Sequence, residues 1–180
     1  MILVISGTNR KGNKTQAFAK HYFETLKAKS NEEVVYLSLE DVQDCLLHGN
    51  MYNPDGMKSE LKDFQDKTVI PANKWVVVSP EYNGSYPGIL KLFIDAISIR
   101  NYKENFKNTK ILLVGTASGR AGNLRGLDQL TGIFNHVGAT VFPNQLPISG
   151  IGGLLDENDK INNEETIKAI EGHLDGFLAF

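Results

Sequence analysis

Residues 4–26 read VISGTNRKGNKTQAFAKHYFETL, and this stretch contains the local pattern that decides the fold. It overlaps an apolar, β-branched run at residues 2–6, which predicts a strand. A turn with two glycines and two cations, Arg10 and Lys11, comes next, and apolar residues then recur at helical spacing. The stretch therefore predicts a strand, a tight turn and a helix over residues 14–28.

The same strand-to-helix alternation continues along the rest of the chain. Further strands are predicted at residues 33–39, 75–80, 110–117 and 139–143. Further helices are predicted at residues 58–66, 87–99, 123–137 and 164–178. Such alternation gives a parallel sheet with helices on both faces. The sequence thus predicts an α/β protein, a flavodoxin-like three-layer sandwich whose five-stranded parallel sheet has the order 2-1-3-4-5. Residues 150–165 are expected to form a flexible loop.

Composition and charge narrow the class of protein. The chain has 180 residues, of which 41% are apolar, and this is typical of a single domain over residues 1–180. A net charge of −2 and the lack of Lys/Arg-rich runs argue against a nucleic-acid partner. Cys45 is the only cysteine, and one free thiol is typical of a reducing compartment. No apolar stretch resembles a signal peptide or a membrane span, so we expect a cytoplasmic protein with no membrane partner.

The turn after the first strand is the first candidate binding site. A helix N-terminus offers unpaired N–H groups and the positive end of the helix dipole, and both favour an anion such as phosphate. Arg10 adds a planar fork that suits phosphate oxygens. Thr8, Asn13 and Thr15 can also donate hydrogen bonds. An equally open alternative is a solvated basic turn in which Asn13 or Thr15 caps the helix. Neither the Walker pattern nor G-x-G-x-x-G is present.

The second candidate loop lies in SPEYNGSYPGILKLFIDAIS, residues 79–98. It follows the third predicted strand, at the sheet edge where folds of this class bind ligands. Pro80 and Pro87 stiffen the loop, and its backbone amides and Tyr82 suit the edge and face of a flat ring system. The alternative is a plain strand-to-helix turn with Pro87 at the helix start.

The third candidate loop is GTASGRAGNLRG, residues 115–126, a glycine-rich turn between the fourth predicted strand and its helix. Thr116 and Ser118 can reach a ligand, and the glycines keep this wall thin. Arg120 and Arg125 are expected to remain solvated, as surface arginines usually do.

These residues resemble the NADPH-dependent FMN reductases of the flavodoxin-like superfamily, which include quinone, chromate and azo-dye reductases. The strongest similarity is PEYNGSYPGILKLFIDAIS, residues 80–98, to the family's Pro-Glu-Tyr-Asn-x-Ser-x-Pro-Gly-x-Leu-Lys segment. SGTNRKGNKTQAFA, residues 6–19, is similar to the family's phosphate loop, and TASGRAGNLRG, residues 116–126, to its second glycine loop. The resemblance extends from residue 2 to about residue 148.

The resemblance implies a bound FMN, NADPH or NADH as co-substrate, and a small-molecule electron acceptor. The FMN phosphate would be held by Thr8, Arg10, Asn13, Thr15 and Gln16. The isoalloxazine ring would be bordered by Pro80, Glu81, Tyr82 and Asn83, and on its other side by Ser118, Gly119 and Gly122. The family also tends to form homodimers or homotetramers through the helices after the third and fourth strands.

The implied activity is an oxidoreductase that passes a hydride from NAD(P)H through FMN to a quinone, azo compound, metal oxyanion or flavin. Because the flavin carries this chemistry, we expect no catalytic side chain and no metal. One of Arg10, Lys11 and Arg120 is expected to favour the additional phosphate of NADPH. Two alternatives stay open: a flavodoxin-like electron carrier for a protein partner, without small-molecule turnover, and an FMN-free binding protein with the same fold. Arg10 and the small net charge weigh against the carrier, since such carriers are usually strongly acidic.

Overall fold

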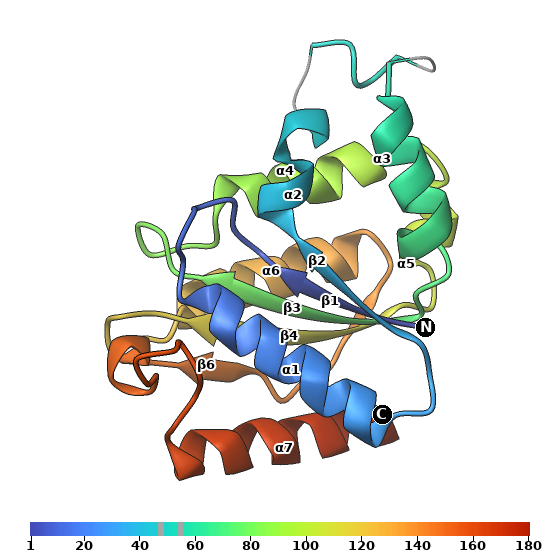
Figure 1. Ribbon diagram of the computed structural model, residues 1–180. Coiled ribbons are helices and arrows are strands. Elements are labelled where there is room, and N and C mark those ends of the chain that lie inside the picture. The colour runs from blue at the N-terminus through green and yellow to red at the C-terminus, as the bar shows by residue number, and fades with distance from the viewer. Residues whose placement is uncertain (47–48, 54–55) are drawn as a thin grey trace.

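The computed structural model describes residues 1–46, 49–53 and 56–180. Its centre is a parallel sheet between two helical layers (Figure 1). The strands are β1 Ile2–Ser6, β2 Val34–Ser38, β3 Lys74–Pro80, β4 Lys110–Thr116, β5 Thr140–Val141 and β6 Leu146–Ile148. The order β2-β1-β3-β4-β5 confirms the predicted flavodoxin-like sheet, and β6 pairs with β4 as well.

The helices divide between the two faces of this sheet. One face is covered by α1 (Thr15–Lys29) and α7 (Glu164–Ala179), which lie side by side in Figure 1. The other face is covered by α2 (Leu39–Leu46), α3 (Ser59–Phe64), α4 (Gly88–Ile97), α5 (Tyr102–Phe106) and α6 (Leu124–His136). Over the described ranges, the chain has no helix with both the length and the apolar character that crossing a bilayer requires.

The central strands have continuous apolar middles, residues 2–5, 75–78 and 111–114, because helices cover both of their faces. In β1, Leu3 packs with the α4 and α6 layer, whereas its neighbour Val4 packs with the α1 and α7 layer. In β3, Trp75 likewise packs with the α4 and α6 layer and Val76 with the α1 and α7 layer. All four side chains are fully buried. This period of two fixes the register, in which Leu3 lies beside Trp75 and Trp75 beside Ile111.

The fifth strand differs from its prediction. Residues 139–143 form only the two-residue strand β5, which pairs with the start of β4. The chain leaves the sheet around Pro143, which has no N–H to donate to a ladder. It returns as β6, which pairs with the end of β4 through Thr116 and Ile148. The edge of the sheet is therefore built from two short strands in succession.

Several short elements were missing from the sequence prediction. Helices α2 and α5 were not predicted, and the predicted helix at 58–66 is α3 followed by a π-helical turn, Gln65–Val69. The expected flexible loop at residues 150–165 is instead an ordered excursion. It contains the 3₁₀ turn Ile151–Gly153 and a bridge between Leu155 and Ile161. The 3₁₀ turn lies next to the third loop, because the Ile151 N–H donates to the Ala117 carbonyl at 3.2 Å.

A buried polar cluster joins α1 to α7. His173 is 3% exposed, and its Nδ1 lies 3.0 Å from the hydroxyl of Tyr22. Its Nε2 lies 2.5 Å from the carbonyl oxygen of Asn144. A neutral ring that donates from Nε2 and accepts at Nδ1 satisfies both neighbours. Burial lowers the pKa of His173, and the bond to Asn144 opposes this effect only in part.

The depressed pKa predicts that stability decreases at mildly acidic pH. The unfolded chain binds a proton at His173 at higher pH than the folded chain does, so the contribution of His173 is complete above about pH 6.5. It is lost as the pH falls through the folded pKa, with a slope of at most about 1.4 kcal/mol per pH unit. We expect His173→Gln, which keeps a donor and an acceptor but does not titrate, to flatten the decrease. Urea unfolding between pH 7.5 and 5 checks this, and an unchanged slope in the variant would contradict it.

Candidate functional site

Three loops meet at the carboxyl edge of the sheet, as the sequence predicted. They follow β1, β3 and β4, which are neighbours in the sheet. The Gly7 N–H donates to the Val78 carbonyl at 2.8 Å, and the Glu81 N–H donates to the Thr116 carbonyl at 2.9 Å. Together with the 3₁₀ turn they enclose a cavity of about 390 Å³. Its walls are Arg10, Gly12, Asn13, Lys14, Thr15, Pro80, Glu81, Tyr82, Thr116, Ala117, Ser118, Ile151 and Gly152.

The first loop presents backbone donors to this cavity. Gly12 has φ 63°, a left-handed conformation that turns the chain sharply into α1. The side chain of Asn13 stabilises the turn from within: its Oδ1 accepts from the Gln16 N–H at 3.0 Å, and its Nδ2 donates to the Arg10 carbonyl at 2.6 Å. Within the described parts of the chain, the N–H groups of residues 11–15 have no acceptor. Free donors at a helix start, with Arg10 and Lys14 beside them, form a site for an anion.

Two pairs of hydroxyl groups connect the first loop to the other two. Thr8 Oγ1 lies 2.7 Å from the Tyr82 hydroxyl, and it also accepts from the Arg10 N–H at 3.2 Å. Thr15 Oγ1 lies 3.0 Å from Thr116 Oγ1. Thr8 and Thr116 are fully buried, and Thr15 is 2% exposed. These hydroxyls position the loops relative to one another, and the phenol of Tyr82 points toward Thr8.

The second loop is a tight two-residue turn. Asn83 and Gly84 have φ 53° and 78°, and Tyr82 and Ser85 exchange N–H···O bonds of 2.8 and 3.1 Å across it. Asn-Gly is the favoured pair where both central residues need positive φ. The turn projects beyond the cavity, which explains why Asn83 is not one of its lining residues.

The third loop packs closely against the sheet at two glycines, Gly115 and Gly122, where a side chain has no room. A Cβ on Gly115 would lie 2.0 Å from the Gly122 carbonyl oxygen, and one on Gly122 would lie 2.8 Å from the Pro147 backbone. Gly122, at φ 58°, therefore lets the backbone of the third loop turn and pack directly on the backbone of β6. Asn123 follows in a left-handed conformation and is fully buried. Its N–H donates to Glu81 Oε2 at 3.1 Å, so the third loop is bonded to the second.

The predicted site residues fall into three groups. Seven of them line the cavity, namely Arg10, Asn13, Thr15, Pro80, Glu81, Tyr82 and Ser118. Thr8 lies beneath the cavity, bonded to Tyr82. Gln16, Asn83, Gly119 and Gly122 are not among the lining residues. The prediction omitted Lys14, Ala117, Ile151 and Gly152. The last two were assigned to a flexible loop, although the sequence GIGG after a strand at this edge was an available signal.

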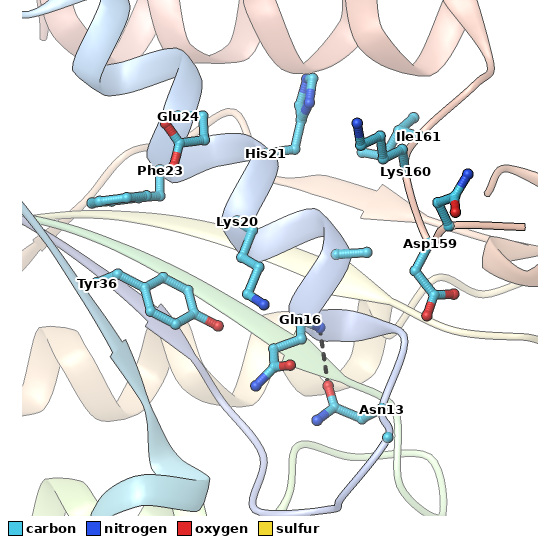
Figure 2. Close-up of a pocket in the computed structure, with 13 residues that line it drawn as sticks. Asn13, Gln16, Lys20, His21, Phe23, Glu24, Tyr36, Asp159, Lys160 and Ile161 are labelled. Carbon is cyan, nitrogen blue, oxygen red and sulfur yellow. Dashed lines mark hydrogen bonds between the residues drawn. The ribbon is translucent and has the colours of Figure 1, made fainter. Parts of the chain in front are cut away.

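A wider hollow of about 780 Å³ lies on the other side of the first loop, along the outer face of α1. Gly12 and Asn13 line both spaces. Figure 2 shows Gln16 and Lys20 of α1 beside Tyr36 of β2, with Lys160 on the opposite side of the helix. Most of the α1 side chains here are polar or charged. Gln16 therefore faces away from the anion site.

Comparisons with known proteins agree with this arrangement. The model of the family described as NADPH-dependent FMN reductase matches residues 1–152. An FMN-dependent NADPH-azoreductase of Staphylococcus haemolyticus is 30% identical over 118 residues, which are 65% of this chain and 60% of that protein. A protein of the same description from Staphylococcus aureus is 28% identical over an equal length. The chain thus aligns with about three fifths of the length of these curated relatives.

Solved structures show the same fold. The flavoenzyme NAD(P)H:(acceptor) oxidoreductase FerB from Paracoccus denitrificans has a TM-score of 0.81 at 20% identity, and the match covers 99% of this chain and 94% of that one. An azoreductase from Bacillus anthracis has a TM-score of 0.67 at 16% identity and covers 99% of both chains. These likenesses establish the architecture, and the family match covers most of the chain, including all three loops. The chain therefore belongs to the NADPH-dependent FMN reductase family.

Proposed function

We propose that this protein is an FMN-dependent NAD(P)H oxidoreductase that passes a hydride from NAD(P)H, through FMN, to a small acceptor such as a quinone, azo compound, metal oxyanion or flavin. One observation carries the proposal. At one end, the 390 Å³ cavity has two cations and N–H groups without an acceptor in the described residues, and at the other end it has thin loop walls. A ligand that joins a dianion to a flat ring would place its dianion at the first end and its ring at the second. We propose that residues 1–180 act as one FMN-binding unit.

The anion end of the cavity fits the FMN phosphate. Arg10 and Lys14 supply two positive charges, and the N–H groups of residues 11–15 supply directional donors. Asn13 would act indirectly, because both ends of its amide already hold the turn in shape. Thr15 lines the cavity and its hydroxyl can both donate and accept, so a bond to Thr116 leaves it able to serve a phosphate oxygen.

The other end fits a flat ring between the second and third loops. Pro80, Glu81 and Tyr82 form one wall, and Ala117 and Ser118 form the other. Asn83 and Gly119 would border the ring from the loop tips, and Gly122 would act through the shape that it gives to the third loop. FMN, when bound, supplies the hydride chemistry, so the protein's task is to bind, orient and leave one ring face open. Glu81 would orient loops, since its carboxylate already accepts from Asn123.

Turnover by the isolated protein tests this proposal. We expect purified protein supplied with FMN to oxidise NADPH continuously once a quinone or azo dye is added. A flavodoxin-like electron carrier would instead bind FMN and show no sustained NADPH oxidation without a protein partner. Absence of both FMN binding and turnover would contradict the proposal and favour a binding protein with the same fold.

Arg120 provides a test of co-substrate preference. Its side chain is exposed on the third loop, where an additional phosphate on NADPH would find a cation. We expect Arg120→Ala to lower the ratio of kcat/KM for NADPH to that for NADH by about 3- to 10-fold. Arg125→Ala, an exposed arginine in the first turn of α6, is the matched control. An unchanged ratio in Arg120→Ala would remove Arg120 from the account.

We also propose that the protein forms a homodimer or homotetramer through α4 and α6. A groove of about 580 Å³ lies between these helices, with the apolar side chains of Ile94, Ile133 and Val137 along it. Light scattering on the purified protein measures the assembly directly, and a monomer mass would contradict it.

A cytoplasmic location completes the proposal and is supported by the free thiol of Cys45.

A further inference from the structure

Asn123 makes more contacts to the site than the loop sequence suggests. It is fully buried, and its Nδ2 donates to three oxygens of the second loop region. These are the Ser79 carbonyl at 3.0 Å, Ser79 Oγ at 3.2 Å and the Pro80 carbonyl at 3.0 Å. Its backbone N–H donates to Glu81 Oε2 at 3.1 Å. We call these four bonds the Asn123 cross-link.

The cross-link is maintained against two unfavourable features. Asn123 has φ 68° and ψ 26°, a left-handed conformation that is uncommon for a residue with a side chain. Its Oδ1 is buried and has no hydrogen-bond partner within the described ranges. The next turn of α6 makes room for this oxygen, because a Cβ on Gly126 would lie 2.1 Å from it. Strained conformations and unpaired buried atoms of this kind gather where a site needs a fixed geometry.

The cross-link joins one proposed wall of the ring site to the start of α6, which directly follows the loop that forms the other wall. Pro80, Glu81 and Tyr82 line the cavity from one side, and Ala117 and Ser118 line it from the other. The bonds to Asn123 span 42 to 44 residues of sequence. The Glu81 carboxylate also lies at the N-terminal end of α6, where the helix dipole favours a negative charge. One side chain and one carboxylate thereby hold the walls together beyond the point where β3 pairs with β4 and the Glu81 N–H donates to the Thr116 carbonyl.

We infer that Asn123 is a positioning residue for the flavin ring: by fixing Ser79, Pro80 and Glu81 against the start of α6, it sets the spacing of the two loops that border the isoalloxazine. This inference rests on the proposed function. If Asn123 has this role, the site consists of two parts that can be altered independently. The turn at residues 10–15 recognises the phosphate, and the Asn123 cross-link shapes the ring site.

The test is Asn123→Gly, because glycine accepts the positive φ while it removes the three side-chain bonds. We expect the Kd for FMN to rise by about 10-fold or more. We also expect the visible absorption bands of bound FMN and its midpoint potential to shift, since the ring meets altered walls. The ratio of riboflavin to FMN affinity should stay constant, because the phosphate turn is untouched.

Asn105→Ala is the matched control. Asn105 is another fully buried amide, and its Nδ2 donates to the carbonyls of Ile97 and Arg100 at the end of α4. We expect it to lower the thermal midpoint while FMN affinity and spectrum remain those of the wild type. If Asn123→Gly does not fold, Ser79→Ala removes one bond of the cross-link at a residue that does not line the cavity, and a smaller spectral shift in the same direction is expected.

Two outcomes would overturn the inference. One is an Asn123→Gly protein, or its Ser79→Ala substitute, that loses stability but binds FMN with unchanged affinity, spectrum and potential. The other is a shift of equal size in Asn105→Ala. Either result can be distinguished from failure of the proposed function, because in that case the wild-type protein itself would not bind FMN.

Discussion

Arg10→Ala is expected to weaken FMN binding by about 10- to 100-fold, because a charge-assisted hydrogen bond contributes about 1.5–3 kcal/mol. Arg10 lines the cavity at the turn where the N–H groups of residues 11–15 have no acceptor in the described chain. Removal of its guanidinium leaves Lys14 as the one cation among the residues that line this cavity. The measurement is a titration of flavin fluorescence with purified apoprotein.

Lys11→Ala is the control for this prediction. Lys11 is a neighbouring exposed cation, and it does not line the cavity. The Lys11→Ala substitution removes one positive charge from the same turn, as Arg10→Ala does. An exposed charge contributes only about 0–1 kcal/mol to an ionic interaction. We therefore expect a change in Kd of less than about 5-fold. Equal effects of the two substitutions would show that only the net charge of the turn matters, and would contradict a directed contact from Arg10.

Gly115→Ala is expected to lower the free energy of unfolding by about 3 kcal/mol, since the new methyl group cannot be accommodated. A Cβ at this position would lie 2.0 Å from the Gly122 carbonyl oxygen and 3.1 Å from the Asn123 Cβ. Both neighbours belong to the third loop, which must move away from β4 to relieve the clash. We therefore expect weaker FMN binding together with the loss of stability. Urea unfolding and flavin titration on the same sample measure both effects.

Gly172→Ala is the matched control. Gly172 lies within α7, and a Cβ there would meet nothing within 4 Å. The same added methyl group is expected to stabilise the protein by about 0.5–1 kcal/mol, because alanine loses less conformational entropy in a helix than glycine does. If Gly115→Ala unfolded at the wild-type urea concentration, the close packing of the third loop against β4 would be wrong.

Much of the fold could be predicted from local patterns. The buried strands at β1, β3 and β4 are continuous apolar runs, and their order follows from the strand-and-helix alternation. The interruption of the last strand at Pro143 was less visible, because the β-forming residues Thr140, Val141 and Phe142 resemble a longer strand until the missing N–H of Pro143 is considered. Helices α2 and α5 are short, with eight and five residues, and a periodicity spans too few turns to be recognised in such segments.

The site was predictable at the level of loops and less so at the level of side chains. The three loops follow from the rule that ligands bind at the carboxyl edge of the sheet. The roles of individual residues depend on contacts between segments far apart in sequence. Thr8 is bonded to Tyr82, 74 residues away, and Asn123 to Ser79, 44 residues away. A single sequence gives no information on such pairings, so Asn123 was passed over and Thr8 was assigned directly to the phosphate.

The most direct test of the account compares FMN with riboflavin, which has the same ring and lacks the phosphate. The central claim is that the turn between β1 and α1 binds a dianion through Arg10, Lys14 and the N–H groups of residues 11–15. Isothermal titration of the wild-type apoprotein with each flavin measures this directly. We predict that FMN binds more tightly than riboflavin by about 100-fold or more. Equal affinities for the two flavins would contradict the claim.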